Sequence, residues 1–115
     1  MGKRVALAVA TGLVAVTALA GSSAGAGGSA TVKVVDNVFS PDRVQVGKGS
    51  RVRFKWVNTE EKHNIIKVKG PGPSFSSDTT DQPGFVYKKR FRKAGRYKII
   101  CSIHPDEMVM RVKVG

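Results

Sequence analysis

The chain has 115 residues, and its 20 lysines and arginines outnumber its 8 aspartates and glutamates to give a formal net charge of +12. This length allows at most one domain, and a lone cysteine excludes a disulfide within the chain. So large a positive charge would suit a nucleic acid partner. The basic residues, however, mostly alternate with apolar ones, as on the solvent-exposed face of a half-buried strand. We therefore expect no nucleic acid partner.

Residues 1–26 are typical of a secretory signal peptide. Lys3 and Arg4 precede an apolar run over residues 5–20, and small residues allow cleavage near 20 or near 26. The run is shorter than the roughly 18 unbroken apolar residues of a membrane-spanning helix, so we expect cleavage rather than an anchor. The expected location is the periplasm, the cell envelope or the extracellular medium. A flexible linker over residues 27–30 and a single domain over residues 31–115 should follow.

The rest of the chain alternates short strand patterns with turn signals. Strands are expected over residues 31–35, 44–46, 51–57, 63–69, 85–92, 96–101 and 108–114. The clearest alternation puts Val52, Phe54 and Trp56 on one face of a strand and cations on the other. Residues 37–42 should form a turn, and residues 70–84, rich in glycine, proline and serine, an irregular stretch. No segment has a sustained helical period, so about seven strands predict an all-β, antiparallel two-sheet sandwich.

The segment from Cys101 to Met108 carries the chemistry of the sequence. It holds the only cysteine, one of the two histidines and one of the three methionines within eight residues. Cys101 should end one strand and Met108 begin the next, so that a hairpin loop presents His104. A thiolate, an imidazole and a thioether favour copper over calcium or magnesium. The other histidine, His63, would arrive from elsewhere in the fold, and we expect the four side chains to bind one copper ion.

Other roles for this segment fit the sequence less well than copper binding. A lone cysteine is often an inert, buried thiol, and a structural zinc site would need more thiolates or histidines than are present. An enzyme with Cys101 as nucleophile and His104 as base would need an orienting group and an oxyanion site, and none is identifiable in the sequence. We therefore expect no enzyme. Two imidazoles and a thiolate with a weak axial thioether favour type 1 (blue) copper and electron transfer. An extracytoplasmic copper carrier or buffer that uses the same ligands without redox cycling stays open.

The order and spacing of several segments resemble those of the cupredoxins, especially the small plastocyanin-like and amicyanin-like blue copper proteins. The matching segments are residues 44–49, 52–58, 63–64, 94–97 and 101–108. This resemblance implies a Greek-key β-sandwich with copper near one end. It implies that His63, Cys101 and His104 are equatorial ligands and that Met108 is the axial one. It further implies that Asn64 ties the His63 segment to the cysteine loop by hydrogen bonds.

The resemblance also implies that His104 is a partly exposed electron exit and that the partners are redox proteins. The chain departs from the family in its longer loop, where Asp106 and Glu107 precede Met108, and in Met110, which the strand phase assigns to the core. We expect Asp106 and Glu107 to bear on the potential and on the choice of partner. The positive charge predicts partners with an acidic surface and attraction to an anionic cell-envelope surface. We expect a monomer.

Overall fold

The computed structural model describes residues 28–115, so the predicted signal peptide lies outside the described residues. These residues form eight strands and no helix. The strands are β1 (Ser29–Val35), β2 (Val38–Ser40), β3 (Arg43–Val46), β4 (Ser50–Trp56), β5 (Ile66–Lys69), β6 (Val86–Phe91), β7 (Gly95–Ile100) and β8 (Val109–Val114). Within residues 28–115 there is accordingly no helix of the length and hydropathy needed to cross a membrane.

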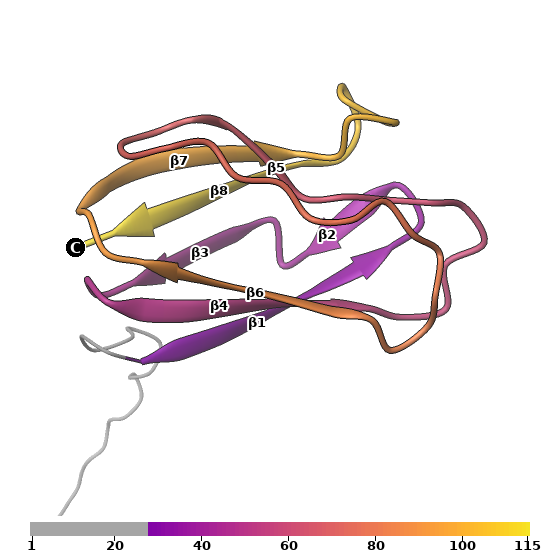
Figure 1. The fold of residues 1–115 in the computed structure, drawn as a ribbon, viewed down its shortest axis with the longest axis horizontal. Helices are drawn as coiled ribbons and strands as arrows, with labels where there is room; N and C mark the ends of the chain where they lie inside the picture. Colours follow the sequence, from indigo (N-terminus) through magenta and orange to yellow (C-terminus); the bar gives the residue numbers. More distant parts are fainter. Residues whose placement is uncertain (1–27) are drawn as a thin grey trace, which may run out of the picture.

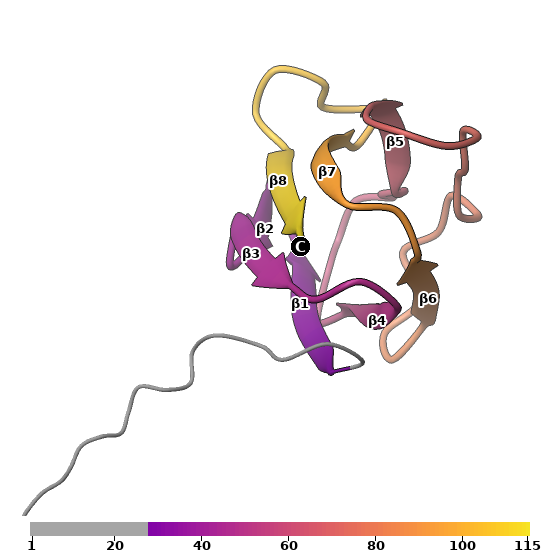
Figure 2. The same cartoon turned by 90° about the vertical axis from the view of Figure 1, so that its left-hand side faces the viewer.

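The strands form two four-stranded sheets that pack face to face, in the orders β2-β1-β4-β6 and β3-β8-β7-β5. Figure 1 shows the two layers from the side, and Figure 2 shows them after a quarter turn. The predicted β-sandwich is confirmed. It differs from the prediction in that two pairings, β1 with β4 and β3 with β8, are parallel, so both sheets are mixed. The chain crosses to the other sheet between β2 and β3 and returns before β4, which brings β4 beside β1 in the same direction.

The core lies between the sheets and follows the predicted alternation. Val52, Phe54 and Trp56 of β4 are fully buried, and the cations between them are exposed. The facing sheet contributes the buried side chains of β7 and β8, among them Ile99 and Met110. Because burial of a large apolar side chain is worth about 1.5–3 kcal/mol, these inward rows hold the sandwich together.

Strand boundaries differ from the sequence prediction by more than one residue in three places. The expected turn over residues 37–42 contains β2, because Phe39 is buried and pairs with Val34 of β1. Strand β1 begins at Ser29, two residues earlier than predicted, because Ser29 pairs with Arg51. The expected strand over residues 63–69 is wrong in its first part, since β5 starts at Ile66.

The irregular stretch between β5 and β6 is confirmed, and it folds back along the segment that carries His63. His63 and Thr80 exchange two backbone hydrogen bonds of 3.0 Å, and the Trp56 indole N–H donates to the Thr80 carbonyl at 2.8 Å. At the other end of the stretch, the buried Lys67 ammonium donates to three carbonyls at 2.5–3.0 Å, those of residues 71–73. His63 is therefore fixed between a loop and the core although it lies outside a strand.

Candidate metal centre

His63, Cys101 and His104 come together at one end of the sandwich. Their ligand atoms all lie within 4.8 Å of one another, and the Cys101 Sγ is 3.9 Å from the Nδ1 of each histidine. His63 precedes β5, whereas Cys101 and His104 belong to the loop between β7 and β8, at the end of the molecule away from the C-terminus (Figure 1). Cys101 and His63 are fully buried, and the His104 side chain is 16% exposed. A buried thiolate between two imidazoles is a donor set that a soft or borderline metal ion fits.

Backbone hydrogen bonds close the loop that presents His104. The His104 N–H donates to the Cys101 carbonyl at 3.2 Å, and the Met108 N–H donates to the His104 carbonyl at 2.9 Å. The Cys101 N–H donates to the Met108 carbonyl at 3.1 Å, so the loop starts and ends on a paired residue. Ile103, at the tip, is 47% exposed. This short closed turn positions His104 over Cys101.

The surroundings of Cys101 lower the pKa of its thiol. Burial raises its pKa, but the backbone N–H of Asn64, the two imidazoles and the backbone N–H of Ile103 lower it more, and the pKa falls to about 7. Metal ions bind the thiolate rather than the thiol. The hydrogen bond to Cys101 raises the pKa of His104, burial opposes this, and Glu61 adds to the increase.

Asn64 joins the two segments that carry the candidate ligands. Its side-chain N–H groups donate to the hydroxyls of Thr79 and Ser102, each at 2.9 Å, and its side-chain oxygen accepts the Ser102 backbone N–H at 2.9 Å. Asn64 is 5% exposed. These bonds connect the residue after His63 with the residue after Cys101, so they restrict the relative movement of the two segments.

Met108 and Met110 are both buried, at 0% and 1% exposure. Met108 stands immediately before β8, on the loop that carries His104. Met110 lies within β8 opposite Ile99 of β7, among the apolar side chains of the core. This placement favours Met108 over Met110 as the thioether nearer the candidate metal centre.

Two carboxylates at the site were missed by the sequence reasoning. Asp36 Oδ1 lies 2.9 Å from His63 Nε2, and Glu61 Oε1 lies 2.6 Å from His104 Nε2. Backbone hydrogen bonding by Glu60, with a smaller effect of His63, lowers the pKa of Asp36. Glu61 stands two residues before His63, and this spacing was the only local indication of an acidic residue near a histidine. Glu61 nevertheless contacts His104 and not His63. No local pattern in the sequence relates position 36 to position 63.

Charge is divided between the strands and the loops at the site. None of the eight strands contains an aspartate or glutamate, whereas every strand except β2 contains at least one lysine or arginine. Seven of the eight acidic residues lie in the loops at the site end: Asp36, Glu60, Glu61, Asp78, Asp81, Asp106 and Glu107. The candidate metal centre of this basic protein is thus surrounded by acidic loops.

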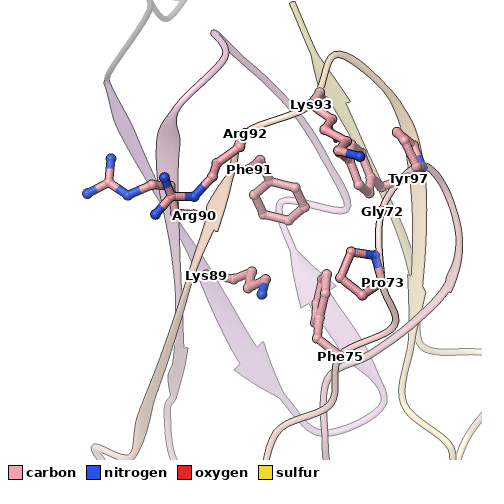
Figure 3. A pocket seen from close by; sticks show the side chains of 10 residues that line it. Gly72, Pro73, Phe75, Lys89, Arg90, Phe91, Arg92, Lys93 and Tyr97 are labelled. Carbon is pink, nitrogen blue, oxygen red and sulfur yellow. Dashed lines mark hydrogen bonds between the residues drawn. The ribbon is translucent and has the colours of Figure 1, made fainter.

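A surface hollow lies away from the candidate metal centre, between β6 and the loop after β5. It encloses about 210 Å³, and Figure 3 shows the Phe75, Phe91 and Tyr97 rings lining it beside Lys89. The Lys89 ammonium sits 4.9 Å from the centre of the Phe75 ring. The lining contains no histidine, cysteine or carboxylate, so this hollow offers no set of metal ligands.

Comparison with known proteins relates the chain to copper proteins. A family model described as a cupredoxin-like domain matches residues 5–114. Among solved structures, a copper-containing nitrite reductase from Thermus scotoductus shares 30% identity at a TM-score of 0.63. That match covers 74% of this chain but 22% of the nitrite reductase chain. Sequences of curated proteins gave no match.

Small single-domain structures match over most of their own length. A purple cupredoxin from Nitrosopumilus maritimus shares 25% identity at a TM-score of 0.64, and the match covers 75% of this chain and 99% of that one. A mutant of amicyanin in a reduced Cu(I) form shares 23% identity at a TM-score of 0.66, and the match covers 78% and 85%. The amicyanin likeness supports the shared fold alone.

Proposed function

The chain belongs to the cupredoxin-like domain family, and on that premise we propose that it is a type 1 copper protein that shuttles single electrons between redox partners. The observation that carries this proposal is the convergence of His63, Cys101 and His104 within 4.8 Å at one end of the sandwich. Two imidazoles and one thiolate are the equatorial donors of blue-copper electron-transfer sites.

The residues fit one copper ion. His63 and His104 direct Nδ1 toward the Cys101 sulfur, and the lowered pKa of Cys101 makes the thiolate accessible near neutral pH. Met108 is proposed as the axial thioether. Bound copper would supply a one-electron couple between Cu(I) and Cu(II). Asn64 and the closed loop hold the donors in place, which limits the rearrangement that a change of oxidation state demands.

We propose a carrier of electrons and not an enzyme. Residues 28–115 contain one group of histidine, cysteine and acidic side chains able to hold a metal ion, the one described above. The nitrite reductase that matches is far longer, and this chain corresponds to about a fifth of it. A single buried metal site with one partly exposed histidine suits electron exchange through His104.

We also propose export, with cleavage of the signal peptide near residue 20 or near residue 26, and a monomer in solution. The cationic strands should attract the protein at long range to an acidic protein surface or to an anionic cell-envelope surface. The acidic loops at the site favour cationic groups on whatever part of a redox partner contacts His104. Both attractions should weaken as ionic strength rises.

Electrochemistry of the copper-loaded protein tests this function. We expect a reversible one-electron couple, with copper retained in both oxidation states through repeated cycles. Copper that is released each time the protein is reduced would contradict electron transfer and would favour a copper carrier or buffer that uses the same ligands.

A further inference from the structure

Both candidate histidine ligands are hydrogen-bonded to a carboxylate on the side away from Cys101. His63 Nε2 lies 2.9 Å from Asp36, and His104 Nε2 lies 2.6 Å from Glu61. The two carboxylates belong to one arrangement, because the Glu61 backbone N–H donates to Asp36 Oδ1 at 3.2 Å. The chain therefore supports its two imidazoles with two loops that contact each other, the turn after β1 and the loop between β4 and β5.

The chemistry of these contacts fixes a tautomer. An ionised carboxylate only accepts hydrogen bonds, so each Nε2 must carry the proton, and in the neutral ring Nδ1 then keeps its lone pair. Nδ1 is the nitrogen that lies 3.9 Å from the Cys101 sulfur in both cases. The carboxylates thus turn the free lone pairs of both rings toward the candidate metal centre.

The two contacts differ in exposure. Asp36 accepts two further backbone N–H groups and supports a histidine that is fully buried. The Glu61 side chain is 57% exposed, and it covers the outer nitrogen of His104, the candidate ligand that reaches the surface. Glu61 can therefore be changed with little effect on packing, whereas Asp36 is part of the fold.

We propose that Glu61 is a positioning residue for His104, holding its ring in the Nε2–H tautomer and lowering the copper potential through its negative charge. This inference rests on the proposed function. A carboxylate on the outer nitrogen makes an imidazole a stronger donor, and the added negative charge favours the more highly charged Cu(II) over Cu(I). Any partner that contacts His104 Nε2 must displace Glu61.

Glu60 offers a matched control one residue away. It is also exposed, and its carboxylate makes no hydrogen bond or ion pair with any residue of the described chain. Its substitution removes the same charge from the same loop without touching His104. The full chain would be loaded with copper and compared as Glu61→Gln, Glu61→Ala, Glu60→Gln and Glu60→Ala.

The first measurement is the Cu(II)/Cu(I) reduction potential of each copper-loaded variant. Loss of a group that supports a ligand typically changes metal affinity about 10–100-fold. We expect Glu61→Gln to weaken Cu(II) relative to Cu(I) by about tenfold, which raises the potential by about 59 mV for a one-electron couple. Glu61→Ala should raise it further, and the Glu60 variants should change it by much less.

The second measurement is nuclear magnetic resonance of the Cu(I)-loaded protein. The His104 Nε2–H proton should be observed in the unsubstituted protein and in Glu61→Gln, whose amide oxygen still accepts, and should exchange rapidly with water in Glu61→Ala. Equal potentials and equal Nε2–H exchange in the Glu61 and Glu60 variants, with every protein keeping its thiolate-to-copper absorption, would overturn the inference alone. Absence of that absorption in the unsubstituted protein would overturn the proposed function itself.

Discussion

Replacement of Asn64 by alanine should uncouple the two segments that carry the candidate ligands. The change removes three hydrogen bonds of 2.9 Å made by the Asn64 side chain, which belongs to a residue only 5% exposed, whereas Ser102 is exposed. A typical hydrogen bond contributes about 1 kcal/mol net, within a range of about 0.5–1.5 kcal/mol. We expect the free energy of unfolding of the metal-free protein to fall by about 2–4 kcal/mol, a large part of the 5–15 kcal/mol typical of a domain.

Urea denaturation, followed by the fluorescence of Trp56, measures this loss. Ser102→Ala removes one of the three bonds and keeps the backbone contact, so it should cost about 1 kcal/mol. The double variant should be less destabilised than the sum of the two single variants, because both remove the same bond. Gln45→Ala, at an exposed position of β3, should change stability by less than about 0.5 kcal/mol. A loss for Asn64→Ala no larger than that of Gln45→Ala would refute the reasoning.

Met108→Leu should shift the copper potential, whereas Met110→Leu should mainly lower the free energy of unfolding by up to about 1.5 kcal/mol; the reverse pattern would assign the thioether to Met110. Because the folded-state pKa of Asp36 is lowered, its stabilisation of the metal-free protein should be present above the ordinary carboxyl value of 3.8 and lost as pH falls below it. Asp36→Asn should therefore reduce the fall in stability as the pH drops below 3.8, and an unchanged dependence of the melting temperature on pH would contradict this. Lys67→Met removes the three hydrogen bonds to the carbonyls of residues 71–73 and should lower the free energy of unfolding by about 2–4 kcal/mol in urea denaturation, and an unchanged free energy of unfolding would argue against the contacts.

Those parts of the fold that depend on local alternation could be predicted from the sequence. The row of Val52, Phe54 and Trp56 specifies one buried face regardless of which strands lie beside it. Strand β2 escaped prediction because three residues give no alternation to detect, and it forms only because Phe39 packs in the core against β1. The parallel pairings were not predicted either, because they depend on where the chain crosses from one sheet to the other, and local alternation carries no information about that.

The candidate ligands could be chosen from their chemical types and from the short spacing between Cys101 and His104. The carboxylates could not, because Asp36 and His63 are 27 positions apart and meet only through the packing of two loops. Glu61 lies beside His63 in sequence yet contacts His104, so proximity along the chain would have given the wrong partner. Hydrogen bonds between loops depend on the assembled fold and leave no periodic signal.

The most direct test of a type 1 copper site at His63, Cys101 and His104 is the visible absorption spectrum of the Cu(II)-loaded protein beside that of Cys101→Ser. We expect an intense band from charge transfer between the Cys101 thiolate and Cu(II), and its complete loss in the serine variant. A colourless protein after Cu(II) titration with Cys101 reduced, or a band that survives in Cys101→Ser, would contradict it.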